Sequence, residues 1–167
     1  MATFQTQSFI KHDDYMTPKS AWEDIKQYIP TEKIIWEAFY GSGKSGEYLT
    51  EMGFNVIHDK DDFFASNKGE IIISNPPFSK IPQILKRLKE LNKPFILIMP
   101  SSKINTQYFR NVFSEADDRI QIIIPKKRIN FEKHVDGKIP EGWLDRCNFD
   151  CFYYCWKINL ERDIIFA

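Results

Sequence analysis

The sequence predicts an α/β protein with a mainly parallel sheet. Helix-like and strand-like stretches alternate along the chain, which is the pattern of layered α/β folds. An amphipathic stretch at 81–91 precedes the fully apolar run 95–99, as expected for a surface helix followed by a strand buried on both faces of a sheet. The 167 residues suit a single core, and no linker or repeat divides them. We therefore expect one domain over residues 1–167.

The N-terminal half supplies two helices and two strands. Thr17 and Pro18 are typical of a helix start, with Thr17 as the N-cap and Pro18 in the first turn. Gly53 is typical of a helix end. The expected elements are, in order, a helix over 19–28, a strand over 33–36, a helix over 45–52 and a strand over 54–58.

The C-terminal half continues the alternation. Its clearest element is the helix at 81–91, where apolar residues recur at three- and four-residue steps. The segment 126–146 is basic and contains glycine and proline, which predicts an exposed loop or hairpin of a length that is usually functional. The expected elements are a strand over 70–74, a helix over 81–91, and then a strand over 95–99, a helix over 108–113, a strand over 120–124 and a strand over 149–158.

The composition narrows the class of protein. With 23 basic and 23 acidic residues the formal net charge is zero, so any surface for nucleic acid must concentrate its positive charge on one face. No apolar run approaches the roughly 20 residues of a membrane span. Residues 1–14 contain no apolar signal-peptide core. We expect a soluble, intracellular, cytoplasmic protein with no membrane contact.

Three cysteines lie close together near the end of the sequence: Cys147, Cys151 and Cys155. An odd number in one short cluster is not a disulfide framework. Because the surrounding residues favour a strand, we interpret the cysteines as buried structural thiols rather than metal ligands, and no metal site is expected.

A glycine turn, Gly41-Ser42-Gly43, follows the predicted strand over 33–36. Such a turn brings backbone N–H groups close to a ligand. Residues 38–45 loosely fit a phosphate-binding loop, with alanine in place of the first glycine. A nucleotide hydrolase also needs a magnesium-binding Asp at the end of a second apolar strand, and the run 71–73 is followed by no carboxylate. This disfavours the phosphate interpretation. The alternative takes Glu37 as an acid at the strand tip that is followed by a glycine-rich turn.

The tetrapeptide Asn75-Pro76-Pro77-Phe78 follows the strand predicted over 70–74. Such a segment can activate a conjugated amino group. The amino nitrogen of adenine, for example, is a poor nucleophile because its lone pair is delocalised into the ring. The side-chain oxygen of Asn75 and the carbonyl of Pro76 can each accept one amino hydrogen, which favours a pyramidal, nucleophilic nitrogen. The prolines fix the backbone in advance, so the acceptors need no reorganisation as charge develops. Phe78 can stack on a base rotated out of the helix.

Together with Tyr15, Thr17 and Pro18 upstream, these motifs resemble those of the small phage- and virus-type Dam family of DNA adenine methyltransferases. In the family's cofactor motif an acid is followed by Pro-Phe-x-Gly-x-Gly; here Glu37, Phe39, Gly41 and Gly43 match and Ala38 replaces the proline. The resemblance implies a three-layer Rossmann-like class I methyltransferase fold with an antiparallel C-terminal strand. It further implies transfer of a methyl group from S-adenosylmethionine to N6 of adenine in DNA, and a viral or phage origin.

The resemblance also assigns roles. Glu37 and the glycine turn would hold the methionine part of S-adenosylmethionine, Asp59 would accept the ribose hydroxyls, and Asp62 and Phe63 would flank the cofactor's adenine. The cofactor-binding residues expected in full are Tyr15, Thr17, Pro18, Glu37, Ala38, Phe39, Gly41, Ser42, Gly43, Asp59, Asp62 and Phe63.

Nucleic acid is expected to contact a set of basic residues, namely Lys80, Lys103, Lys126, Lys127 and Arg128, with Lys133, Trp143 and Arg146 as possible additions. No stretch is large enough for a separate target-recognition domain, so a homodimer is expected to supply further surface for gripping a duplex.

Three alternatives remain open. RNA adenine or a protein glutamine amide could be the methyl acceptor, because each presents a conjugated amino group. A catalytically weak nucleic-acid-binding subunit with the same fold is the third.

Overall fold

The computed structural model describes residues 15–133 and 149–167. Its strands are β1 (Tyr15–Met16), β2 (Ile35–Trp36), β3 (Val56–Ile57), β4 (Ile71–Ser74), β5 (Phe95–Pro100), β6 (Ile120–Ile124), β7 (Glu132–Lys133), β8 (Cys151–Trp156) and β9 (Ile164–Phe166). Its α-helices are α2 (Lys19–Glu23), α3 (Lys44–Glu51), α4 (Ile81–Glu90) and α5 (Gln107–Val112). Short 3-10 helices are η1 (Lys26–Tyr28), η2 (Phe63–Ala65), η3 (Phe78–Lys80) and η4 (Ser101–Asn105).

A seven-stranded mixed sheet forms the centre of the molecule, in the order β3-β2-β4-β5-β8-β6-β9. Only β8 among these strands runs antiparallel to its neighbours, β5 and β6. The chain moves from β2 outward to β3, and then returns to the other side of β2 to lay down β4 and β5. The strand order therefore reverses between β2 and β4, which is where open α/β sheets bind their ligands.

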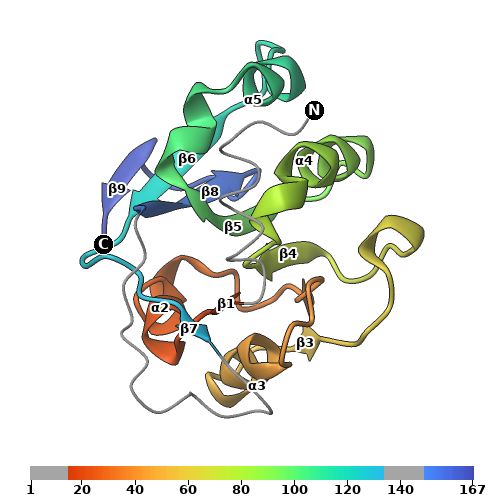
Figure 1. Cartoon of the computed structure of the whole chain (residues 1–167), viewed down its shortest axis with the longest axis vertical. Coiled ribbons are helices and arrows are strands. Elements are labelled where there is room, and N and C mark those ends of the chain that lie inside the picture. Colours follow the sequence, from red (N-terminus) through yellow and green to blue (C-terminus); the bar gives the residue numbers. More distant parts are fainter. Residues whose placement is uncertain (1–14, 134–148) are drawn as a thin grey trace.

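Helices cover both faces of this sheet (Figure 1). Helix α2 packs against α3, and α4 packs against α5, and the two pairs lie on opposite sides of the strands. Strand β5 is buried along its whole length, as its continuous apolar run predicts. The apolar face of α4 packs against the sheet through Ile81, Ile84, Leu85 and Leu88, all of them buried. None of the helices in the described part of the chain is both long and apolar enough to cross a lipid bilayer.

The α/β prediction is confirmed at the level of a mixed, mainly parallel sheet with helices. Strand β6 has the predicted bounds, and α4, β4, β5 and β8 differ from the predicted ranges by a few residues at their ends. The predicted helix over 108–113 forms one residue earlier as α5, where the Thr106 hydroxyl accepts a hydrogen bond from the Phe109 amide at 3.4 Å.

The helix predicted over 19–28 is wrong in its extent and in its cap. It divides into α2 and η1, and Pro18 rather than Thr17 occupies the N-cap position. The hydrogen bonding tightens at Ile25, whose carbonyl accepts from the Tyr28 amide at 2.9 Å. Trp22, Ile25 and Ile29 are all buried, so the tighter turn lets the segment keep its apolar side chains on the core.

Three strands were not predicted from the sequence. β1 and β7 form a small antiparallel sheet that pairs Met16 with Glu132, and β7 lies inside the segment expected to be a loop or hairpin. β9 pairs in parallel with β6 at the edge of the main sheet. Two-residue strands such as β1 and β7 carry no periodic signal, and their pairing depends on residues far apart in the sequence.

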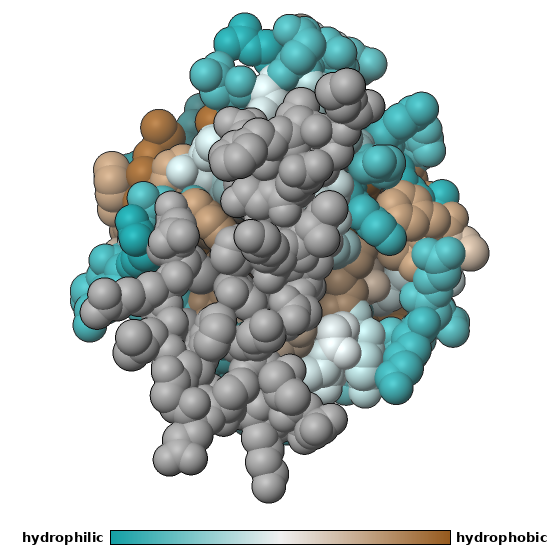
Figure 2. Space-filling model, in the orientation of Figure 1, coloured by the Kyte–Doolittle hydropathy of each residue, from teal (hydrophilic) through white to brown (hydrophobic). Residues whose placement is uncertain are grey.

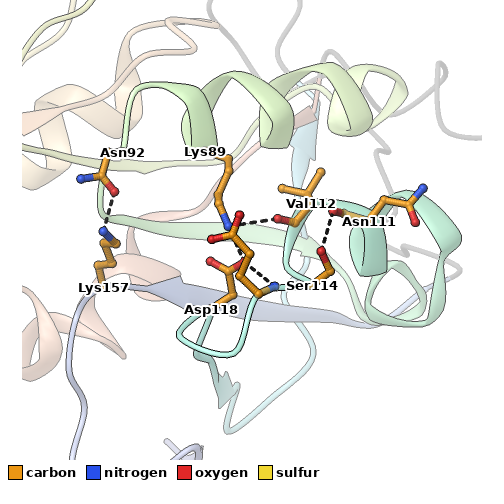
Figure 3. Close-up of polar contacts among 8 residues, drawn as sticks. Lys89, Asn92, Asn111, Val112, Ser114, Asp118 and Lys157 are labelled. Atoms are coloured by element: carbon orange, nitrogen blue, oxygen red, sulfur yellow. Dashed lines mark hydrogen bonds and ion pairs between the residues drawn. The ribbon is translucent and has the colours of Figure 1, made fainter.

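Lys89 joins α4 to the segment between α5 and β6 (Figure 3). Its ammonium group donates to the carbonyl of Val112 at 3.2 Å and pairs with Asp118, whose side chain is only 4% exposed. The Asp118 carboxylate also accepts from the Glu115 amide at 3.1 Å. Lys89 lies over the ring of Trp156 in β8 at 5.7 Å, so this one residue connects the C-terminal ends of α4 and α5 to the sheet.

Replacing Lys89 by methionine should lower the free energy of unfolding by about 3 kcal/mol, because it leaves the Asp118 carboxylate buried without its cation. Urea denaturation measures the change. Lys86→Met on the exposed face of the same helix is the matched control, and it should change stability by less than about 0.5 kcal/mol. Equal stability of the two variants would show that the Lys89–Asp118 pair contributes nothing net.

Candidate functional site

The candidate site lies where β2 and β4 end. The two strands are adjacent and parallel, with Ile35 opposite Ile71 and Trp36 opposite Ile72. Glu37 directly follows β2, and Asn75 directly follows β4. The register of the strands therefore brings the two motifs to one edge of the sheet, at the point where the strand order reverses.

A cavity of about 210 Å³ opens at this edge. Seven residues expected at the site line it: Thr17, Glu37, Phe39, Gly41, Ser42, Asn75 and Pro77. Met16, Tyr40 and Ser45 also line it and were missed, although Met16 and Tyr40 are next to predicted residues and Ser45 is two residues after Gly43. The volume is below the roughly 300–1,000 Å³ of sites for whole drug-sized molecules, so the cavity suits one end of a larger ligand.

Glu37 contributes a carboxyl group to the lining of the cavity. It is 1% exposed, and its Oε1 accepts a hydrogen bond from the Ser74 hydroxyl and another from the Phe39 amide at 3.3 Å. Burial raises the pKa of Glu37 to about 8, although both hydrogen bonds oppose that shift. Its Oε2 is buried and has no hydrogen-bond partner among the described residues. Burial without a cation keeps the carboxyl protonated, and a cationic donor at this oxygen would let it ionise.

Two hydroxyl groups add to the polar lining. Thr17 Oγ1 and Ser42 Oγ are buried and, within residues 15–133 and 149–167, accept or donate no hydrogen bond. Both residues line the same cavity as Glu37. Buried polar groups in folded proteins are nearly always paired, so a cluster of three such atoms around one cavity indicates a polar ligand.

Two positions of the glycine turn leave no room for a side chain. Gly41 and Gly43 have φ of 56° and 80°, in the left-handed region that glycine adopts without strain. A side chain at Gly41 would place its first carbon 3.0 Å from the Met16 sulfur, and one at Gly43 would lie 2.8 Å from the Tyr40 hydroxyl. Met16 also accepts the Ser42 amide hydrogen at 3.3 Å, which ties the segment before α2 to the turn.

The presence of Glu37 in this cavity further disfavours the phosphate-loop interpretation. A phosphate held by the turn would lie in the same 210 Å³ as a buried carboxyl group. A phosphate there would oppose ionisation of Glu37 still further, whereas a cation would form an ion pair with the ionised carboxyl. The cavity therefore favours a ligand with positive charge.

The Asn-Pro-Pro-Phe segment turns directly from β4 into η3. The Pro77 carbonyl accepts from the Lys80 amide at 3.1 Å, and Pro76 is buried. Phe78 is also buried, with its ring edge-on to Phe131 at 5.9 Å and to Phe149 at 5.6 Å. Those contacts hold the segment against the core, and stacking of Phe78 on a base stays a prediction.

Other predicted residues lie outside the cavity. Pro18 is next to the lining residue Thr17, and Ala38 and Gly43 are buried in the turn segment. The Tyr15 side chain is outside the part of the molecule that the structure describes. Phe63 is buried against Phe39 at 4.9 Å.

The two acids assigned to the cofactor lie beyond β3. A hydrogen bond from Lys68 lowers the pKa of Asp59 and keeps it a charged acceptor. Asp62 accepts from the Phe64 amide at 2.9 Å and so caps η2. The structure brings neither acid to the Glu37 cavity, and their cofactor roles stay predictions.

Basic residues gather at the same edge of the sheet. Lys80 follows β4, Lys103 follows β5, and residues 126–128 follow β6, and these three strands run in the same direction. Lys126, Lys127 and Arg128 face a cavity of about 600 Å³ that Pro18 and Ser20 also line. Arg128 pairs with Asp150 at 2.8 Å. Lys80 lies in a separate groove beside α4.

Several expectations fall partly outside the described residues. Trp143, Arg146 and Cys147 belong to 134–148, which lies outside the described residues, as does the Lys133 side chain. Cys151 and Cys155 are buried in β8, as predicted, and burial raises the pKa of the Cys155 thiol. In the described ranges, no group of three or more His, Cys, Asp or Glu side chains could hold a metal ion.

No family model, no curated protein and no solved structure matches this chain.

The raised pKa of Glu37 gives a pH-dependent stability that can be measured. Between about pH 4.5 and about pH 8 the folded protein retains a proton that the unfolded chain releases, so the free energy of unfolding falls as pH rises. Glu37→Gln carries no titrating group and should lack this slope. Its stability relative to the unchanged protein should therefore increase across that range in chemical denaturation without ligand. Parallel curves for the two proteins would contradict the pKa shift.

Proposed function

We propose that this protein transfers a methyl group from S-adenosylmethionine to the N6 amino group of adenine in DNA. The observation that carries the proposal is the shared cavity at the ends of β2 and β4, which both the buried Glu37 carboxyl and Asn75 line. Glu37 can form an ion pair with a cation, and Asn75 begins a segment that is suited to holding a planar amino group.

The proposal includes the finer fold assignment, a three-layer Rossmann-like class I methyltransferase. A mainly parallel sheet with one antiparallel strand near the C-terminus supports it. The placement of the helix pairs on opposite faces is compatible with three layers (Figure 1).

The cavity fits the amino-acid end of S-adenosylmethionine. The α-ammonium group can donate to Glu37 Oε2, and the Thr17 and Ser42 hydroxyls can donate to the α-carboxylate. A cation beside Glu37 favours the ionised carboxyl, which offsets the effect of burial on its pKa. The nucleoside end is then left for Asp59 and Asp62 beyond β3. When bound, the cofactor supplies an electrophilic methyl group on a positively charged sulfur.

Asn75 and Pro76 prepare the nucleophile. The Asn75 side-chain oxygen accepts one hydrogen of the adenine amino group, and the Pro76 carbonyl accepts the other. The nitrogen lone pair is then free to form the bond to the methyl carbon as the carbon–sulfur bond breaks. The nitrogen becomes acidic on methylation and loses its extra proton to water, so no strong base is needed at Asn75.

The basic residues at the same edge favour nucleic acid over a protein amide as the methyl acceptor. In a chain of zero formal net charge, Lys80, Lys103 and residues 126–128 all follow the ends of parallel strands. Phosphate contacts supply most of the non-specific affinity for DNA. Labelled methyl transfer to separate pools of DNA, RNA and protein distinguishes the three substrates.

Asn75→Ala should abolish transfer of tritiated methyl groups to an adenine-containing oligonucleotide and leave cofactor binding intact.

Glu37→Ala should instead weaken cofactor binding, measured by calorimetry, because it removes the acceptor for the ammonium group. The contrast between the two variants separates catalysis from binding. Undiminished transfer by Asn75→Ala, or unchanged cofactor affinity in Glu37→Ala, would remove that residue from the mechanism.

We also propose a homodimer formed through β9. This strand is the last in the sheet order, and its Phe166 side chain is 77% exposed. An open apolar edge is a template for pairing with a second copy. Sedimentation should show a dimer that Phe166→Lys dissociates. A monomeric profile of the unchanged protein, both with and without DNA, would overturn the proposal.

A further inference from the structure

A second groove lies on the surface between η2 and α4. It has a volume of about 490 Å³ and is lined by Phe64, Lys80, Gln83, Lys86, Arg87 and Glu90. We call it the η2–α4 groove. Figure 2 shows an apolar patch surrounded by hydrophilic side chains at the right of the molecule, where η2 lies in Figure 1. None of the residues assigned to the cofactor lines this groove.

Phe64 is exposed on a fixed support. Its side chain is 40% exposed, while its amide donates to the Asp62 carboxylate at 2.9 Å. Arg87 donates to the Phe63 carbonyl at 3.0 Å and to the Ser66 carbonyl at 2.8 Å, and so binds both ends of η2 to α4. A rigidly held, exposed aromatic ring can bind a planar partner at little cost in conformational entropy.

The charges of the groove are suited to phosphate. Lys80 and Lys86 are exposed, and neither forms an ion pair with another described residue, whereas the half-buried Lys19 and Lys44 pair with Glu51 and Glu47. Arg87 adds a third positive charge, and Glu90 is the one acid in the lining. Aromatic rings that stack bases beside cations that track the backbone are how proteins bind single-stranded nucleic acid.

The groove is close in the chain to the proposed catalytic segment. Lys80 ends η3, which begins at Phe78 of the Asn-Pro-Pro-Phe tetrapeptide. A strand that presents an adenine at Asn75 can therefore continue past Lys80 toward Phe64.

We propose that the η2–α4 groove binds a single-stranded stretch of the DNA substrate, with one unpaired base stacked on Phe64 and phosphates contacting Lys80 and Lys86. This rests on the proposed function, because it takes the DNA that carries the target adenine as the occupant.

The test is fluorescence anisotropy of a labelled single-stranded DNA oligonucleotide, with the full chain and without cofactor. Phe64→Ala should bind roughly five- to a hundred-fold more weakly, as for the loss of one base–aromatic stack. Phe64→Trp, which keeps a stacking ring, should bind as the unchanged protein does. Lys86→Gln should reduce the slope of log affinity against log salt concentration by about 0.7.

Matched controls lie at the opposite end of the parallel strands, just before β2 begins. Ile34→Ala removes a side chain of similar exposure, and Lys33→Gln removes an exposed charge. Neither should alter binding of the single strand. The same oligonucleotide as a duplex should lose much less affinity in Phe64→Ala, because its bases are already stacked.

Three results would overturn the proposal: unchanged single-strand affinity in Phe64→Ala, equal losses on single strand and duplex, or weaker cofactor binding in Phe64→Ala. The last would assign Phe64 to the cofactor. Binding is measured without cofactor, so the proposed function can fail independently of the groove. In that case the unchanged protein binds the oligonucleotide through Phe64 but methylates no DNA.

Discussion

The hydrogen bond from Ser74 to the buried carboxyl group of Glu37 joins the ends of two adjacent strands. Ser74 is the last residue of β4, and Glu37 is the first residue after β2. The bond satisfies one oxygen of a group that is costly to bury and leaves the other without a partner among the described residues. The position of the glycine turn relative to Asn75 follows from this connection.

The same group explains why a ligand is expected. A carboxyl with its pKa raised to about 8 is held neutral over much of the ordinary pH range, and a cationic ligand would ionise it. The stability lost by burying Glu37 is thus recovered when the ligand binds. Phe39 contributes an amide hydrogen bond to the same carboxyl, and Gly41 and Ser42 of the glycine turn line the same cavity.

Much of this arrangement could be predicted from the sequence, because its signals are local. The apolar period of α4, the continuous apolar run of β5 and the turn residues between elements each act over about ten residues. The order of elements implied that Glu37 and Asn75 follow parallel strands, and seven of the predicted site residues do line one cavity. What the sequence determined was the class of fold and the edge of the sheet that carries the site.

Only the tertiary structure decided which side chains reach that site. Phe63 and Phe64 are neighbours of one type. Packing against Phe39 buries Phe63, whereas Phe64 is exposed on the short helix that hydrogen bonds from Arg87 hold against α4. The pairing of β1 with β7 and the exposed edge at β9 likewise depend on contacts between distant residues. Burial and pairing are properties of the whole packed chain, so no local pattern could show that an oxygen of Glu37 has no partner within residues 15–133 and 149–167.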